Sequence, residues 1–159
     1  MKLRCVVSDS IGFAPGAYEL SESFAAAEES GDLYPVEIEG FRRTKWGYTL
    51  DPDEEGHVLH RFTAADGCAF ESFEFMPWLM LPEEWERTDR TYNKVEFSAD
   101  GENYELLHEN VRTYKQDSYW DLTDRVEGLN QFYIRVSAGF PPKTSLVHVR
   151  AAAKFTVAE

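Results

Sequence analysis

The chain has 159 residues, of which 43% are hydrophobic and 28% charged, a composition typical of one globular domain with a sizeable core. Its 16 basic and 29 acidic residues give a formal charge of −13 at pH 7, and such a surface repels phosphate backbones and anionic lipids. Nucleic acid is therefore not an expected partner. Membrane insertion is not expected either, because no run of the sequence reaches the roughly 20 apolar residues of a membrane helix.

The first third of the chain carries few structural signals. The opening "MKLRCVVSDSIGF" lacks the apolar stretch of a signal peptide. We expect a cytoplasmic protein if the chain is complete, and an extracellular or cell-surface one if it is a domain of a secreted parent. The stretch 18–32, "YELSESFAAAEESGD", predicts a short surface helix with Ser21 as its cap and Gly31 at its end. Cys5 and Cys68 are expected to be free buried thiols, and a single bridge between them stays open.

Most of the remaining chain alternates apolar and polar residues with the two-residue period of strands that are buried on one face. The alternating segments are residues 56–64, 68–81, 93–99, 131–140 and 145–159, the last being long enough for one or two strands. Short strands joined by Gly, Asp and Pro turns predict an antiparallel β-sandwich of jelly-roll type. We expect residues 1–159 to form this sandwich as a single domain, with at most one or two short helices.

The stretch "SADGENY", Ser98 to Tyr104, lies between two such segments and predicts a hairpin rather than a site. Asp100 and Gly101 both tolerate positive φ, which a tight hairpin turn requires. Ser98 and Asp100 can hold the turn with side-chain hydrogen bonds to its backbone. Each of these residues therefore has a structural role.

One acidic turn has a pattern related to calcium loops. In "DPDEEG", Asp51, Asp53 and Glu55 stand at alternate positions before a glycine. The twelfth position is Phe62 instead of the glutamate of an EF-hand, and no flanking helices are predicted. A structural calcium is the only cofactor suggested, and a solvated acidic turn is the alternative.

The strongest binding signal is aromatic and lies in loops. A Trp or Tyr ring can stack on the apolar face of a sugar, while neighbouring charged groups bond its hydroxyls. The candidate carbohydrate-binding residues are Trp78, Trp85, Arg87, Arg90, Tyr92, Arg112, Tyr119 and Trp120. Trp85 and Trp120 are the expected stacking surfaces, and "RRTKWGYTL" adds Trp46 and Tyr48. The alternative is that these rings fill the ends of the sandwich.

Four stretches of the chain carry a resemblance to a known family. They are "HRFTAADGCAFESFEF", "VEFSADGENYELL", "YWDLTDRVEGLNQFYIRVSA" and "LVHVRAAAKFTV". Their order resembles that of galactose-binding-like β-sandwich domains, the discoidin and carbohydrate-binding-module type found attached to sialidases and other sugar-processing enzymes. The resemblance covers roughly residues 58–157, rests on architectural motifs, and implies a sandwich that often holds a structural calcium.

We expect no enzymatic activity. The chain has no G-x-S-x-G, its cysteines have no catalytic context, and its many carboxylates are not set apart from the acidic background. The expected function is a non-catalytic carbohydrate-binding module or accessory domain of a larger secreted sugar-processing protein. Its partners would be a carbohydrate and a catalytic domain of the same parent chain. The alternative is a structural or protein-interaction sandwich without a sugar ligand.

Overall fold

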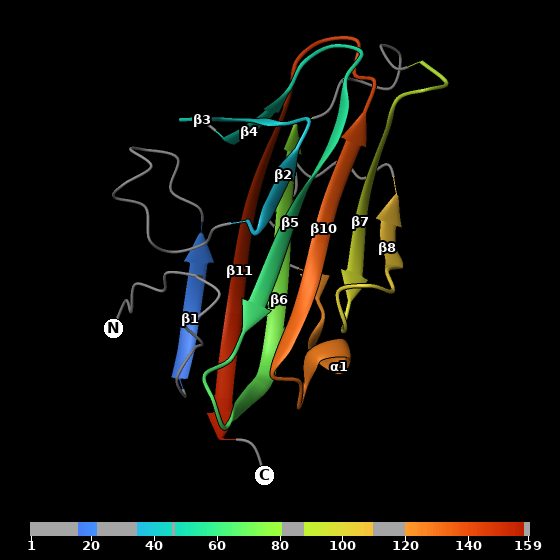
Figure 1. The fold of residues 1–159 in the computed structure, drawn as a ribbon. Helices are drawn as coiled ribbons and strands as arrows, with labels where there is room; N and C mark the ends of the chain where they lie inside the picture. The colour runs from blue at the N-terminus through green and yellow to red at the C-terminus, as the bar shows by residue number, and fades with distance from the viewer. Residues whose placement is uncertain (1–15, 22–34, 46, 81–87, 110–119, 158–159) are drawn as a thin grey trace.

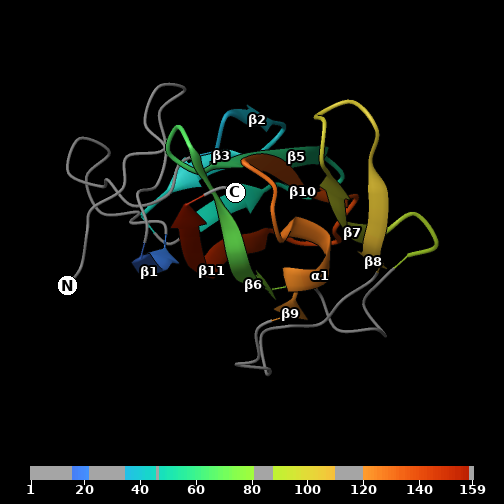
Figure 2. The same cartoon turned by 90° about the horizontal axis from the view of Figure 1, so that it is seen from below.

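A computed structural model describes residues 16–21, 35–45, 47–80, 88–109 and 120–157, and for 16–21 and 78–80 only the backbone. Within these ranges the chain forms two antiparallel sheets packed face to face (Figures 1 and 2). The six-stranded sheet contains β1 (Gly16–Ser21), β3 (Arg42–Thr44), β4 (Gly47–Leu50), β6 (Cys68–Met80), β9 (Trp120–Asp121) and β11 (Ser145–Val157). The five-stranded sheet contains β2 (Glu37–Glu39), β5 (Glu55–Thr63), β7 (Tyr92–Ser98), β8 (Glu105–Glu109) and β10 (Gln131–Gly139). The predicted all-β sandwich is confirmed.

The chain repeatedly crosses from one sheet to the other. The six-stranded sheet has the order β3–β4–β11–β6–β9, with β1 also paired to β11, and the five-stranded sheet has the order β2–β5–β10–β7–β8. From β5 onward only β7 and β8 are consecutive strands within one sheet, which gives the jelly-roll-like arrangement. In the described residues the one helix is α1 (Thr123–Val126), at the lower right in Figure 1 beside the lower end of β10. No helix of the described residues is long and apolar enough to cross a bilayer.

The core is built from phenylalanines of both sheets, as the alternation predicts. Phe132 of β10 is fully buried and its ring centre lies 4.8 Å from that of Phe73 and 4.7 Å from that of Phe70, both on β6. On its own sheet it lies 5.2 Å from Phe62 and 5.6 Å from Phe97. Edge and stacked ring contacts at these distances stabilise beyond the burial of area alone.

A β-bulge allows β6 to bury two phenylalanines that simple alternation would separate. Phe70 and Phe73 are three residues apart, so a regular strand would point them to opposite faces. The register with β11 shifts between Lys154 and Phe155, which pair with Ser72 and Phe70 and leave Glu71 as the extra residue. Both phenylalanines therefore face the core, at 1% and 0% exposure.

The structure changes the interpretation of the N-terminal segment, Tyr48 and the cysteines. The helix predicted from Tyr18 is wrong at its start, because residues 18–21 form part of β1 and pair with Arg150–Ala153 of β11. Pairing with the edge of β11 outweighs the local helix propensity there. Residues 22–34 of the predicted helix lie outside the described residues. Tyr48 is fully buried in the core and is not a binding ring. Cys68 carries a free, buried thiol, and Cys5 lies outside the described residues.

The hairpin predicted at Asp100-Gly101 is confirmed. Gly101 has φ 82° between β7 and β8. The backbone N–H of Gly101 donates to the Ser98 hydroxyl at 2.8 Å, and those of Glu102 and Asn103 donate to Asp100 Oδ1 at 2.8 Å each. The hydrogen bonds that Asp100 accepts from Asn103, Glu102 and the Ser98 hydroxyl hold its pKa well below its ordinary value of 3.8, because they favour the carboxylate.

We expect Gly101→Ala to lower the free energy of unfolding by ~2 to 3 kcal/mol. The added Cβ would combine a positive φ with a contact 2.9 Å from Cε2 of Tyr133. Gly67→Ala is the matched control, because Gly67 has φ +76° but open space around it. It should cost only about 1 kcal/mol in the same urea titration. Equal losses for both variants would contradict the packing of the hairpin on Tyr133.

We also expect the stabilising effect of Asp100 to depend on pH. Because its folded-state pKa is depressed, its contribution is fully present above the unfolded-state value near 4 and is lost as pH falls through the folded-state value. Unfolding of the wild type and Asp100→Asn should therefore differ by a constant amount from pH 7 to 5, and the difference should shrink below about pH 4. A difference that persists unchanged at pH 2 would contradict this account.

Candidate functional site

The eight predicted sugar-binding residues fall on both sides of the described ranges. Trp85, Arg87, Arg112 and Tyr119 lie outside the described residues, as does Trp46. For Trp78 only the backbone is described, in β6 opposite His148. Arg90, Tyr92 and Trp120 are the predicted residues whose side chains are placed, and the structure brings the first two together.

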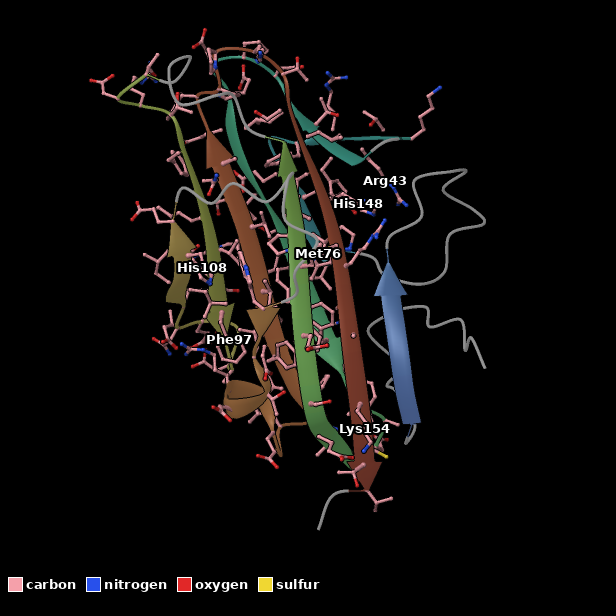
Figure 3. The ribbon with its side chains drawn as sticks, turned by 180° about the vertical axis from the view of Figure 1, so that it is seen from behind. Arg43, Met76, Phe97, His108, His148 and Lys154 are labelled. Atoms are coloured by element: carbon pink, nitrogen blue, oxygen red, sulfur yellow. The ribbon has the colours of Figure 1, made fainter. Side chains whose placement is uncertain are left out.

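Trp120 closes one open edge of the sandwich. It is half-buried and packs against the core, with its ring centre 6.4 Å from that of Phe75 and 4.0 Å from that of His108. His108 belongs to β8 of the opposite sheet, and Figure 3 shows it at this edge, well away from His148 on β11. Burial lowers the pKa of His108 below its ordinary value. The described contacts of Trp120 are therefore those of a ring that joins two sheet edges.

Tyr92 lies across the outer face of the five-stranded sheet at one end of the sandwich. It stands directly opposite Gly139 of β10, which in turn stands opposite Glu55 of β5. A Cβ on Gly139 would lie 2.3 Å from Cε1 of Tyr92, so the ring occupies the space that glycine leaves free. The phenolic O–H reaches over β10 and donates to Glu55 Oε2 at 3.1 Å. The ring is thus held at both ends and remains half-exposed.

Charged and aromatic groups surround this ring. Lys94 Nζ lies 5.5 Å from the ring centre of Tyr92, and the ring of Phe140 lies 6.3 Å from it. The guanidinium of Arg90 stacks on Phe140 at 4.0 Å. We call this set the Tyr92 surface: Glu55, Arg90, Tyr92, Lys94 and Phe140. It offers two rings, one carboxylate and two cationic donors within one exposed patch.

Hydrogen bonds between loops position the Tyr92 surface. The N–H of Phe140 donates to the carbonyl of Glu54 at 2.7 Å, and that of Asp53 donates to the carbonyl of Pro141 at 3.1 Å. The Thr91 hydroxyl donates to the carbonyl of Phe140 at 2.9 Å. Asp53 and Phe140 have φ of 61° and 53°, a region that non-glycine residues seldom adopt. Three separate loops are therefore fixed together beneath the surface.

The environment of Tyr92 keeps its hydroxyl protonated. Burial, the hydrogen bond to Glu55 and the negative charges of Glu55 and Glu96 raise the pKa of Tyr92 to about 12. The phenol is therefore a donor at any physiological pH, and it leaves the second oxygen of Glu55 available as an acceptor.

The carboxylates proposed for calcium are not brought together. Asp51 accepts a hydrogen bond from Arg42 Nη2 at 2.7 Å, and Glu55 accepts one from Tyr92. Asp53 lies exposed at the turn, and the three do not form a set of donor atoms within 4.8 Å of one another. A shared cation would have to displace both existing partners, so this loop gives the calcium hypothesis no geometric support.

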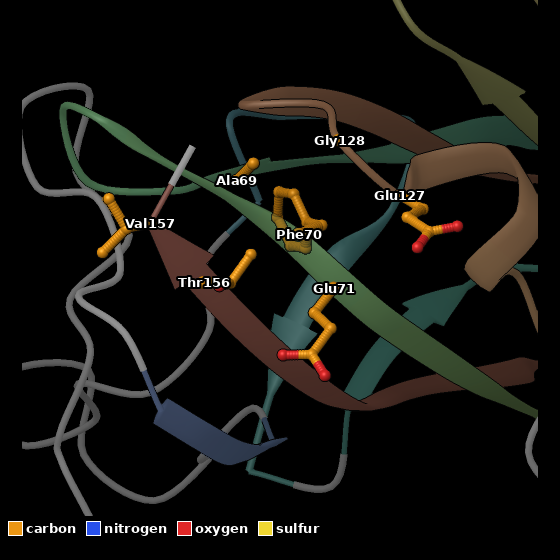
Figure 4. A pocket seen from close by; sticks show the side chains of 7 residues that line it. All are labelled: Ala69, Phe70, Glu71, Glu127, Gly128, Thr156 and Val157. Atoms are coloured by element: carbon orange, nitrogen blue, oxygen red, sulfur yellow. The ribbon is translucent and has the colours of Figure 1, made fainter. Parts of the chain in front are cut away.

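A cavity of about 430 Å³ lies at the opposite end of the sandwich, where β6 begins and β11 ends (Figure 4). Its walls are Ala69, Phe70, Glu71, Glu127, Gly128, Thr156 and Val157. Glu71 is already paired with Lys154 at 2.6 Å. No sequence motif predicts this cavity, because its walls come from three distant segments of the chain. No predicted site residue contributes to it.

Comparisons with known proteins do not identify a family. Neither the models of protein families nor the curated proteins give a match to this chain.

We expect the raised pKa of Tyr92 to appear as a pH-dependent difference in the free energy of unfolding between the wild type and Tyr92→Phe. Because the folded-state pKa of about 12 lies above the unfolded-state value near 10, the contribution of the neutral phenol is present below pH 10 and is lost as pH rises toward 12. The wild type should be more stable than Tyr92→Phe at pH 8, and urea titrations should show this advantage shrinking between pH 10 and 12. An advantage that stays constant to pH 12 would rule out the hydrogen bond to Glu55 as the stabilising contact.

Proposed function

We propose that this chain is a non-catalytic carbohydrate-binding β-sandwich module, and that the Tyr92 surface is its sugar site. The resemblance of its hairpin and strand order to galactose-binding-like domains supports the ligand class and a role as an accessory domain of a larger sugar-processing protein. Such domains bind sugars without transforming them, and a catalytic domain of the parent chain would act on the bound substrate.

The observation that carries the proposal is the position of the Tyr92 ring across Gly139. A ring fixed at both ends loses little conformational entropy when a sugar stacks on it, because it is already ordered. A pyranose presents C–H groups to such a ring and hydroxyls at its rim. Glu55 can accept from these hydroxyls, and Lys94 and Arg90 can donate to them. Apolar stacking and directional hydrogen bonds are thus available within one patch.

An exposed edge strand favours the second candidate, a protein-interaction domain. Val36 and Ile38 are 41% and 40% exposed, and Ile38 belongs to β2 at the edge of the five-stranded sheet. An edge strand with exposed apolar side chains can pair with a strand of another protein. This candidate becomes the better one if no sugar binds the Tyr92 surface.

The experiment is a glycan array followed by calorimetry with the best sugar found. We expect Tyr92→Ala to weaken binding by ~1 to 3 kcal/mol, about 5- to 150-fold, because it removes the stacking ring. Gly139→Ala should also weaken binding, since its Cβ would displace the intact Tyr92 ring. Tyr92→Phe should have the smallest effect of the three because it keeps the ring.

Tyr104→Ala is the control for these variants. Tyr104 is also a half-buried tyrosine, placed just before β8, but its ring covers the guanidinium of Arg135 at 3.8 Å instead of lying over Gly139. Its loss should leave sugar affinity unchanged. Equal weakening by Tyr104→Ala, or normal binding by folded Tyr92→Ala, would place the sugar elsewhere. Absence of binding to any glycan would favour the interaction domain.

A further inference from the structure

A second cluster of side chains lies at the β2 edge of the five-stranded sheet and is separate from the Tyr92 surface. Glu37 and Glu39 stand two residues apart on β2 and share its outer face. Glu39 is directly opposite His57 of β5, and Glu37 is opposite Leu59. Two carboxylates from one strand therefore flank one imidazole from the next.

The imidazole is in contact with both carboxylates. His57 Nε2 lies 2.5 Å from Glu37 Oε1, and His57 Nδ1 lies 3.9 Å from Glu39 Oε2. One donor atom from each of the three residues lies within 4.8 Å of the others. In the described part of the chain this is the one group of three such residues that meets that limit.

We propose that Glu37, Glu39 and His57 bind a divalent transition-metal ion of the zinc type. A set of one imidazole nitrogen and two carboxylate oxygens is suited to Zn²⁺ and its neighbours, whereas Ca²⁺ and Mg²⁺ prefer oxygen ligands alone. Ligands of one metal at about 2.0 to 2.2 Å lie closer together than 4.8 Å, and the two carboxylates approach different nitrogens of the His57 ring. Binding therefore needs a rotation of at least one glutamate side chain toward the ring nitrogen that holds the metal.

The exposure of the three side chains allows this rotation. The side chain of His57 is 21% exposed and held against the sheet, whereas those of Glu37 and Glu39 are 52% and 74% exposed and able to change rotamer. The solvent side leaves room for a water or another ligand to complete the coordination. A dication would replace the repulsion between two carboxylates with attraction to both, on a protein of net charge −13.

The guanidinium of Arg135, which feels the charge of Glu37, is already paired within the protein. The pKa of Arg135 is raised, mainly by the hydrogen bond that its Nε donates to Glu96 Oε2 at 2.9 Å. The negative charge of Glu37 makes a smaller contribution in the same direction. The ring of Tyr104 covers the same guanidinium. Arg135 therefore does not take the place of a cation between Glu37 and Glu39. A bound metal would join β2 to β5 through side chains in addition to their backbone hydrogen bonds.

The experiment measures thermal unfolding of tag-free, chelator-treated protein with ZnCl2, and with CaCl2 and MgCl2 in parallel. We expect the unfolding midpoint to rise with Zn²⁺ concentration and to respond little to Ca²⁺ or Mg²⁺, since a ligand that binds only the folded state stabilises it. His57→Ala should abolish the rise. Glu39→Gln removes a longer contact and should keep the fold while weakening Zn²⁺ binding at least 10-fold by calorimetry.

His108→Ala is the matched control, because His108 is on β8 and contacts Trp120 instead of the cluster. It should keep the full response to Zn²⁺. No response of the wild type, or an equal response in His57→Ala, would overturn the proposal and leave the cluster as an ion pair on an acidic surface. Neither result depends on sugar binding, so this proposal and the proposed function can fail separately.

Discussion

The contact of the two sheets through Phe132 is the constraint on which the other features depend. Its ring lies within 5.6 Å of four other phenylalanines, two on each sheet. Filling this layer requires that β10 present Phe132, Ile134 and Val136 inward, and all three are fully buried. The opposite residues of the same strand, including Arg135 and Gly139, must then lie on the outer face. The core thus determines which side chains are available for function.

On that outer face, small residues make room for rings that lie across the sheet. Gly139 leaves space for Tyr92, and Gly101 approaches the ring of Tyr133 at the hairpin. In both cases a Cβ would come within 3.0 Å of ring carbons. An aromatic side chain that lies across neighbouring strands is better ordered than one in a loop, and ordered groups bind ligands at a lower entropic cost. The ordered ring of Tyr92 is therefore a stronger argument for a binding site at the Tyr92 surface than the charged side chains around it.

Local features of the sequence predicted the strands and the hairpin, but not the pairing between distant segments. The alternation around Val95, Phe97 and Phe132 reports burial directly, and Asp100-Gly101 has few conformations other than a turn. The bulge at Glu71 and the pairing of Tyr18 with β11 depend on partners more than 80 residues away, which no short window contains. The same limit applies to the sites. Tyr92 was predicted as a sugar contact and Glu55 as a calcium ligand, yet they are hydrogen-bonded to each other across β10.

The histidine cluster shows how sheet pairing can create chemistry that a motif does not reveal. His57 and His60 in "HVLH" point to opposite faces of β5, so they cannot share a metal, and His60 is fully buried. The partners of His57 come instead from β2: Glu37 and Glu39 precede it by 20 and 18 residues. His57 also follows Glu55 by two residues on the same face, which places the two proposed sites about 7 Å apart along β5. A cation held by His57 would therefore weaken the negative potential at Glu55 and make that carboxylate less attractive to cationic ligands. The two sites use different residues, but electrostatics gives them a physical route to influence each other.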